Sequence, residues 1–174
     1  MVEPRIGVLM GSDSDLDVME DCLGVLKSFR VAFEVNVMSA HRTPALVHDY
    51  VTTARTRGLK VIICAAGGAA HLAGVVASLT TLPVIGVPMD ATGLGGLDAL
   101  LSTVQMPPGV PVATVGVGRF GATNSALLAL EILAASDNAL ASELQTHRAS
   151  MADSVSKKNA RANERLKDKG LIDV

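Results

Sequence analysis

The stretch Val35-Asn36-Val37-Met38-Ser39-Ala40-His41-Arg42-Thr43-Pro44 joins an apolar strand pattern directly to the start of a helix. Thr43 suits the N-cap position and Pro44 suits the first helical position. A strand that leads straight into a helix is the unit of open α/β sheets, which bind ligands at such turns. Histidine is the side chain that titrates near neutral pH unassisted, and arginine offers a planar fork for phosphate or carboxylate. This turn is therefore the first candidate for a functional site.

The same alternation of strand and helix continues on both sides of this turn. Apolar runs predict five strands, at residues 5–10, 31–38, 59–65, 82–88 and 110–117. Helical periodicity separates them and then predicts one long helix over residues 122–147 and a last helix over 152–169, which Gly170 ends. The pattern predicts an α/β protein with a three-layer flavodoxin-like fold. Its five-stranded parallel sheet has the order 2-1-3-4-5 and is followed by long C-terminal helices.

Length and composition indicate one domain that self-associates. The 174 residues are 49% apolar but only 2% aromatic, so the core consists of aliphatic side chains that bury less area each. A mean hydropathy of +0.39 then favours apolar surface that a monomer would leave in water, and we expect a homo-oligomer. With no repeat or linker, residues 1–174 are expected to form a single domain with a helical tail at about 148–174.

Charge and cysteine content limit the classes of partner and the compartment. The net charge of −2 gives no general attraction to nucleic acid or anionic lipid, and no apolar run reaches the ~18 residues of a membrane span. Residues 148–174 contain seven Lys/Arg and four Asp/Glu, so the tail has a net charge of +3 and the rest of the chain has −5. We interpret the tail as a solvated helix. Cys22 and Cys64 lack a pairing pattern and no signal peptide is apparent, which predicts reduced thiols in a cytoplasmic protein.

Three loops are expected to meet at one edge of the sheet: residues 11–15, 39–44 and 66–74. Each precedes a helix, whose free N–H groups and partial positive charge suit an anion. The small residues of the third loop, which include Gly67 and Gly68, leave room for a ligand or for tight packing against a neighbouring subunit. Both interpretations remain open, since a pocket shared between subunits needs the same residues.

The histidines in these loops each allow two interpretations. His41 is either a proton carrier or a turn residue bonded to a carbonyl; Arg42 beside it, with Ser12 and Asp15 across the crevice, favours catalysis. His71 is either a polar plug or a substrate contact. A metal site from the two histidines is not expected, because no third ligand lies close in the sequence.

Three other ligand-binding patterns are rejected. Residues 116–121 fit the dinucleotide pattern G-x-G-x-x-G, but a long helix follows where a strand with an acidic residue is needed, so we interpret them as a turn into a close-packed helix. A phospho-receiver domain needs Asp after the third strand and Lys after the fifth, where this chain has Ala65 and Gly116. A flavin carrier needs aromatic residues in the crevice loops, and the sequence places none there.

With residues 11–15 (GSDSD), 39–44 (SAHRTP) and 66–72 (AGGAAHL) in this order, the chain resembles the N5-carboxyaminoimidazole ribonucleotide mutase family of purine biosynthesis. Residues 83–88 (PVIGVP) and 105–112 (QMPPGVPV) add to the resemblance, which spans residues 6–135. Family members commonly have proline where this chain has Ala73.

The resemblance implies an isomerase that moves a carboxylate from the exocyclic nitrogen to ring carbon 4 of an aminoimidazole ribonucleotide, by decarboxylation and recarboxylation. By matching position, His41 is the proton carrier, and the substrate-binding residues are Ser12, Asp15, Ser39, Arg42, Gly67, Gly68 and His71. Arg42 and Ser12 match phosphate-binding positions and Asp15 a ribose or ring contact. It further implies no metal, no cofactor and an octamer. The alternatives are direct carboxylation of the same nucleotide, which His71 disfavours, and a non-catalytic nucleotide-binding oligomer.

Overall fold

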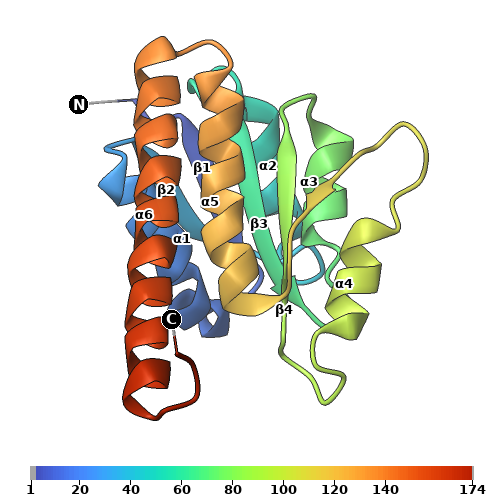
Figure 1. Ribbon diagram of the computed structural model, residues 1–174. Helices are drawn as coiled ribbons and strands as arrows, with labels where there is room; N and C mark the ends of the chain where they lie inside the picture. Colours follow the sequence, from blue (N-terminus) through green and yellow to red (C-terminus); the bar gives the residue numbers. More distant parts are fainter. Residues whose placement is uncertain (1–2, 174) are drawn as a thin grey trace. The chain divides into compact units, whose positions relative to one another are not determined.

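A parallel β-sheet with the order β2-β1-β3-β4-β5 forms the centre of the fold (Figure 1). The computed structural model describes residues 3–173. The strands are β1 (Ile6–Met10), β2 (Phe33–Val37), β3 (Val61–Gly67), β4 (Val84–Met89) and β5 (Ala113–Thr114). The predicted strand order is therefore confirmed.

The central strands β1 and β4 are buried, whereas the edge strand β5 is short. All residues of β1 and β4 are buried, as expected for apolar strands that are covered on both faces. β5 is far shorter than the predicted 110–117. Its late start at Ala113 fits Pro111, which has no N–H to give to the ladder.

Helices cover the sheet on both faces. They are α1 (Leu16–Ser28), α2 (Pro44–Ala54), α3 (Leu72–Leu79), α4 (Leu97–Val104) and α5 (Gly118–Ala134), with a short 3₁₀ turn, η1 (Asp13–Asp15), before α1. Figure 1 shows α1 and α5 on one face and α2 and α3 on the other. Side chains of α2 and α3 such as Val47 and Val76 pack with Leu9 and Ile62 of the sheet in a buried aliphatic core. The predicted three-layer fold is confirmed.

The single long helix predicted over residues 122–147 is wrong. α5 ends at Ala134, and a second helix, α6 (Asn138–Asp168), begins after Asp137, whose carboxylate accepts the N–H of Leu140 at 3.2 Å. This N-cap starts a new helix within an apolar stretch. α6 therefore also absorbs the separate helix predicted over 152–169, and it ends before Gly170, whose φ of 63° is left-handed.

The chain divides into two compact units, residues 1–133 and 134–174. The single-domain organisation, with a tail from about residue 148, stays a prediction. Within residues 3–173, no helix is both long and apolar enough to cross a membrane.

Candidate functional site

The loops that follow β1, β2 and β3 line one pocket of about 280 Å³. Seven predicted site residues lie in its wall: Ser12, Asp15, Ser39, His41, Arg42, Gly67 and His71. Gly68 is not among the lining residues, and its φ of 62° instead gives it a backbone role in the turn. Ala91, from the loop after β4, also lines the pocket; sequence reasoning missed it, although it too follows a strand at this edge. The structure thus brings the predicted residues together, while their roles stay predictions.

The first loop presents hydroxyl groups and a buried carboxyl. Ser12 caps η1, since its Oγ accepts the N–H of Ser14 at 3.3 Å, and the two hydroxyls lie 2.9 Å apart. Asp15 is only 5% exposed. Burial raises the pKa of Asp15 above its usual 3.8, although hydrogen bonds from Ser12 and Ser14 oppose the shift.

The second loop is a turn closed by Ser39 and Thr43. The N–H of Ser39 donates to Thr43 Oγ1 at 2.9 Å, and the Thr43 N–H donates to the Ser39 carbonyl at 2.9 Å. Ser39 Oγ accepts the N–H groups of His41 at 3.3 Å and Arg42 at 3.2 Å. Thr43 occupies the N-cap position of α2 but makes no side-chain capping bond, because its hydroxyl is used within this turn. Pro44 begins the helix as predicted. Ser39 thereby holds the backbone that carries His41 and Arg42.

His41 reaches across the pocket to the third loop. Its Nε2 lies 2.8 Å from Nδ1 of His71, and the two rings are nearly perpendicular, at 80°. One nitrogen must donate and the other accept, so the two imidazoles share a single proton across this contact. Both histidines follow their strands by four residues, counted from Val37 and Gly67. The strands predicted from the sequence end at residues 38 and 65, so this equal spacing becomes visible only with the observed strand ends.

Arg42 ties the second loop to the first. Its Nη2 donates to the carbonyl of Gly11 at 2.8 Å, which fixes the exposed guanidinium beside the pocket opening. Gly67 lies against the fourth loop, where an added Cβ would come within 2.5 Å of Cβ of Ala91. The floor of the pocket therefore needs glycine at position 67.

The arrangement combines an anion hook, an acid/base group and a small-residue floor. The Arg42 guanidinium and the Ser12 hydroxyl suit an anionic group, and His41 can move a proton near them. Among the described residues, no group of three or more His, Cys, Asp and Glu side chains is placed to hold a metal ion.

The turn at residues 116–121 packs closely. Gly121 approaches the carbonyl of Gly116 so tightly that an added Cβ would overlap it. α5 begins directly at Gly118. The dinucleotide pattern needs a following strand with an acidic residue, so we describe this turn as a close-packed corner.

The sequence profile of the AIR carboxylase family matches residues 5–154. The chain is 56% identical over 148 residues to an N5-carboxyaminoimidazole ribonucleotide mutase of Pyrococcus abyssi, covering 85% of this chain and 84% of that protein. It is 55% identical to the enzyme of the same name in Mycobacterium leprae, with 91% of each covered. It is also 53% identical over 145 residues to phosphoribosylaminoimidazole carboxylase of Saccharomyces cerevisiae, covering 83% of this chain and 25% of that protein.

Among solved structures, Treponema denticola PurE is similar, with a TM-score of 0.82 and 27% identity, covering 91% of this chain and 98% of that one.

Proposed function

Since the chain belongs to the AIR carboxylase family, we propose that it is an N5-carboxyaminoimidazole ribonucleotide mutase of purine biosynthesis. It is an isomerase that moves a carboxylate from the exocyclic nitrogen to ring carbon 4 of an aminoimidazole ribonucleotide. Two relatives of that name are at least 55% identical and share 84% or more of their length with this chain.

The reaction needs one group that gives and then takes a proton. As the carbamate C–N bond breaks, carbon dioxide leaves and the exocyclic nitrogen gains a proton. Carbon 4 then attacks carbon dioxide, a C–C bond forms, and the proton on carbon 4 is removed. One imidazole can serve both steps, and His41 is the pocket residue we assign to them.

The observation that carries this proposal is the placement of His41 and Arg42 on one stiff turn, facing loops one and three. Arg42 is bonded to Gly11 and His41 to His71, so both side chains are directed at the pocket. We assign the phosphate to Arg42 and Ser12, and a ribose or ring contact to Asp15, whose buried carboxyl lines the same wall.

Carbon dioxide offers almost no polar handle, so a tight apolar recess must retain it between the two steps. Ala66, Gly67, Ala69 and Leu72 supply small or apolar surface on the third-loop side of the pocket. His71, which lines this pocket, and Gly68 in the same loop are the residues of this loop that we also assign to substrate binding. No cofactor or metal takes part in this scheme.

Direct carboxylation of the aminoimidazole ribonucleotide is the second candidate, since the yeast relative that is 53% identical is named a carboxylase. A non-catalytic nucleotide-binding oligomer is the third. Purified protein incubated with the N5-carboxylated nucleotide in buffer depleted of carbon dioxide separates the three. The mutase forms the carbon-4 carboxylated product at an undiminished rate. A carboxylase makes that product only when carbon dioxide is added, and a binder makes none.

We also propose that the enzyme is a cytoplasmic homo-octamer. Side chains of the fourth loop and α4 are apolar and exposed, which a monomer would leave in water: Leu94, Leu97, Leu101 and Val104. Sedimentation of the purified protein at micromolar concentration tests this, and a single monomeric boundary would contradict it.

A further inference from the structure

The fourth loop, residues 90–96 between β4 and α4, forms part of one wall of the pocket (Figure 1). It lines the pocket through Ala91. A Cβ added to Gly67 would come within 2.5 Å of Ala91 Cβ, and one added to Gly68 would lie 3.9 Å from the methyl carbon of Thr92. The fourth loop therefore lies directly against the third loop, beside the small-residue recess that we assign to carbon dioxide.

The composition of this loop gives its backbone little intrinsic stiffness. Three of its seven residues are glycine, and Gly95 and Gly96 have φ values of 62° and 78°, in the left-handed region. Glycine loses more conformational freedom on folding than any other residue, so a glycine-rich loop opens at a low cost. Gly96 is also the N-cap of α4 and gives that helix no side-chain cap. The position of the loop therefore depends on its side-chain contacts.

One side-chain pair links the loop to α4. The Thr92 hydroxyl donates to Asp98 Oδ2 at 2.8 Å, and Thr92 Oγ1 accepts the N–H of Leu94 at 3.2 Å. Asp98 lies in the first turn of α4, where the free N–H groups of the helix favour a carboxylate. A hydrogen bond to a carboxylate is about twice as strong as one between neutral groups. Thr92 thus joins the loop that faces Gly68 to the beginning of a helix.

The other oxygen of Asp98, Oδ1, is buried and has no hydrogen-bond partner within residues 3–173. A buried polar atom without a partner destabilises the fold. A side chain that served only to stabilise the start of α4 would gain from using this oxygen as well. The bond to Thr92 is therefore the contact that accounts for a carboxylate at position 98, and that bond acts on the fourth loop.

We propose that Thr92 and Asp98 are positioning residues, which hold Ala91 against Gly67 and so keep carbon dioxide in the recess between the two steps of the reaction. Neither side chain touches the reacting atoms. When their hydrogen bond is lost, the fourth loop separates from the third loop more often, and carbon dioxide exchanges with the buffer before carbon 4 attacks it. This inference rests on the proposed mutase function and names the residues that retain its intermediate.

Two substitutions that break the pair test this role. Thr92→Val keeps the carbon that faces Gly68 and loses the hydroxyl, and Asp98→Ala removes the acceptor. Each variant is incubated with N5-carboxylated nucleotide that carries carbon-13 in the carbamate, in buffer that contains unlabelled carbon dioxide. The ratio of unlabelled to labelled product is expected to rise about tenfold over the wild type, the factor by which loss of one hydrogen bond to a charged group shifts the loop toward its open form. KM for the nucleotide should stay close to the wild-type value, because Arg42 and Ser12 are unchanged.

Two control variants separate this role from a general effect on the fold. Thr92→Ser keeps the hydroxyl and should retain the label as well as the wild type does. Ser102→Ala removes the bond from Ser102 Oγ to the Asp98 carbonyl at 2.8 Å, farther along α4, and should also leave the label ratio unchanged. Circular dichroism melting confirms that each variant folds. A pair that only stabilises α4 would lower the melting temperature and leave the label ratio at the wild-type value, which would overturn the proposal.

The outcomes for the wild type keep this proposal apart from the function on which it rests. A wild type that makes no carbon-4 carboxylated product would refute the mutase itself. A wild type that makes the product without retaining the label would overturn the retention of carbon dioxide, and the role of the pair with it. A wild type that retains the label, together with Thr92→Val and Asp98→Ala enzymes that retain it equally, would overturn the role of the pair and leave the mutase intact.

Discussion

Replacing His41 with asparagine separates its chemical role from its structural one. Asparagine is polar but cannot carry a proton, so the proton transfers lose their catalyst, and its shorter side chain gives up the hydrogen bond that His41 Nε2 makes with His71. General acid–base catalysis by a placed side chain contributes about 10²–10⁴-fold, so kcat should fall by that factor, equivalent to about 2.7–5.5 kcal/mol of barrier. KM should change less than about tenfold, because the phosphate hook at Arg42 and Ser12 remains in place.

The same change should cost little stability. His41 is exposed, and its side chain is hydrogen-bonded to His71 Nδ1 at 2.8 Å. A hydrogen bond of this kind contributes about 0.5–1.5 kcal/mol, and the lower end applies at an exposed site. The variant should therefore melt within a few degrees of the wild type.

Steady-state kinetics of the mutase reaction, with thermal melts of the same preparations, measure both effects. His48→Asn is the matched control, since His48 lies on α2, outside the pocket, and contacts Asp49 at 3.3 Å. Its kcat should be unchanged. An active His41→Asn enzyme, or an equal loss in His48→Asn, would refute the assignment of the proton to His41.

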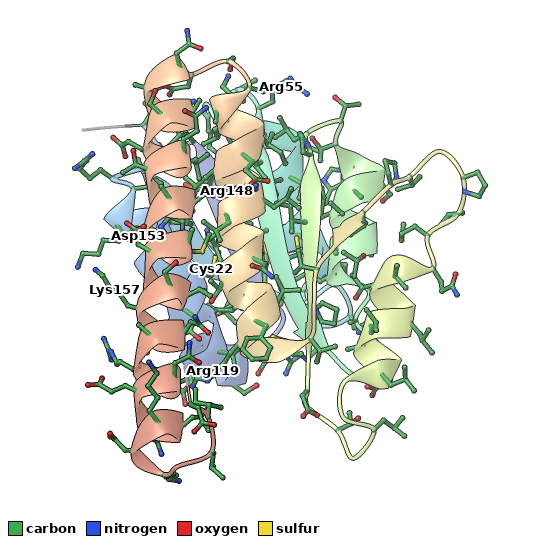
Figure 2. All side chains as sticks on the ribbon, in the orientation of Figure 1. Cys22, Arg55, Arg119, Arg148, Asp153 and Lys157 are labelled. Carbon is green, nitrogen blue, oxygen red and sulfur yellow. The ribbon has the colours of Figure 1, made fainter. Side chains whose placement is uncertain are left out.

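Two further substitutions and one test of thiol reactivity check the geometry of the pocket and the core. Burial raises the pKa of Asp15, so protonation of this carboxyl favours the folded state. This contribution to stability is complete below pH 3.8 and is lost as the pH rises through the raised pKa of the folded protein. Asp15→Asn should therefore melt higher than the wild type at pH 7, lose this advantage as pH falls toward 4, and raise KM by about 10–100-fold through the lost substrate hydrogen bond. Gly67→Ala should cost about 1–3 kcal/mol of unfolding free energy and lower activity, since its Cβ meets Ala91 at 2.5 Å; Gly93→Ala, which meets nothing within 4 Å, is the control for both melts and kinetics. Cys22, labelled in Figure 2, and Cys64 should resist Ellman's reagent in the folded protein and react after denaturation, because both are buried and burial raises the pKa of Cys22 to about 11. Rapid labelling of either thiol in the native state would contradict this burial.

The strand order and the meeting of the three loops were predictable because they depend on patterns that the chain carries locally. Apolar runs such as residues 59–65 favour central strands, as β3 is, and parallel topology places the loops after them at one edge. The equal spacing of His41 and His71 after their strands was not predictable, because the predicted strands ended at residues 38 and 65 and the observed ones end at Val37 and Gly67. The 2.8 Å contact between their rings depends on side-chain directions that spacing alone does not set.

The errors arose where one residue outweighs a regular pattern. Asp137 starts a helix inside an apolar stretch that periodicity extends from residue 122 to 147, and its carboxylate bond to Leu140 is local. Pro111 removes a donor from a stretch whose composition fits a longer strand. Thr43 occupies the predicted N-cap position, but its hydroxyl bonds to Ser39 within the turn and makes no capping bond to the helix.

The fate of a labelled carboxylate tests the central claim most directly. The N5-carboxylated nucleotide is prepared with carbon-13 in the carbamate and incubated with the enzyme in buffer that contains unlabelled carbon dioxide. If carbon dioxide stays in the small-residue pocket between the two steps, the label should be found at the carbon-4 carboxylate of the product. Product that carries the unlabelled carbon of the buffer would contradict the account, since the pocket would then not retain what His41 helps to release.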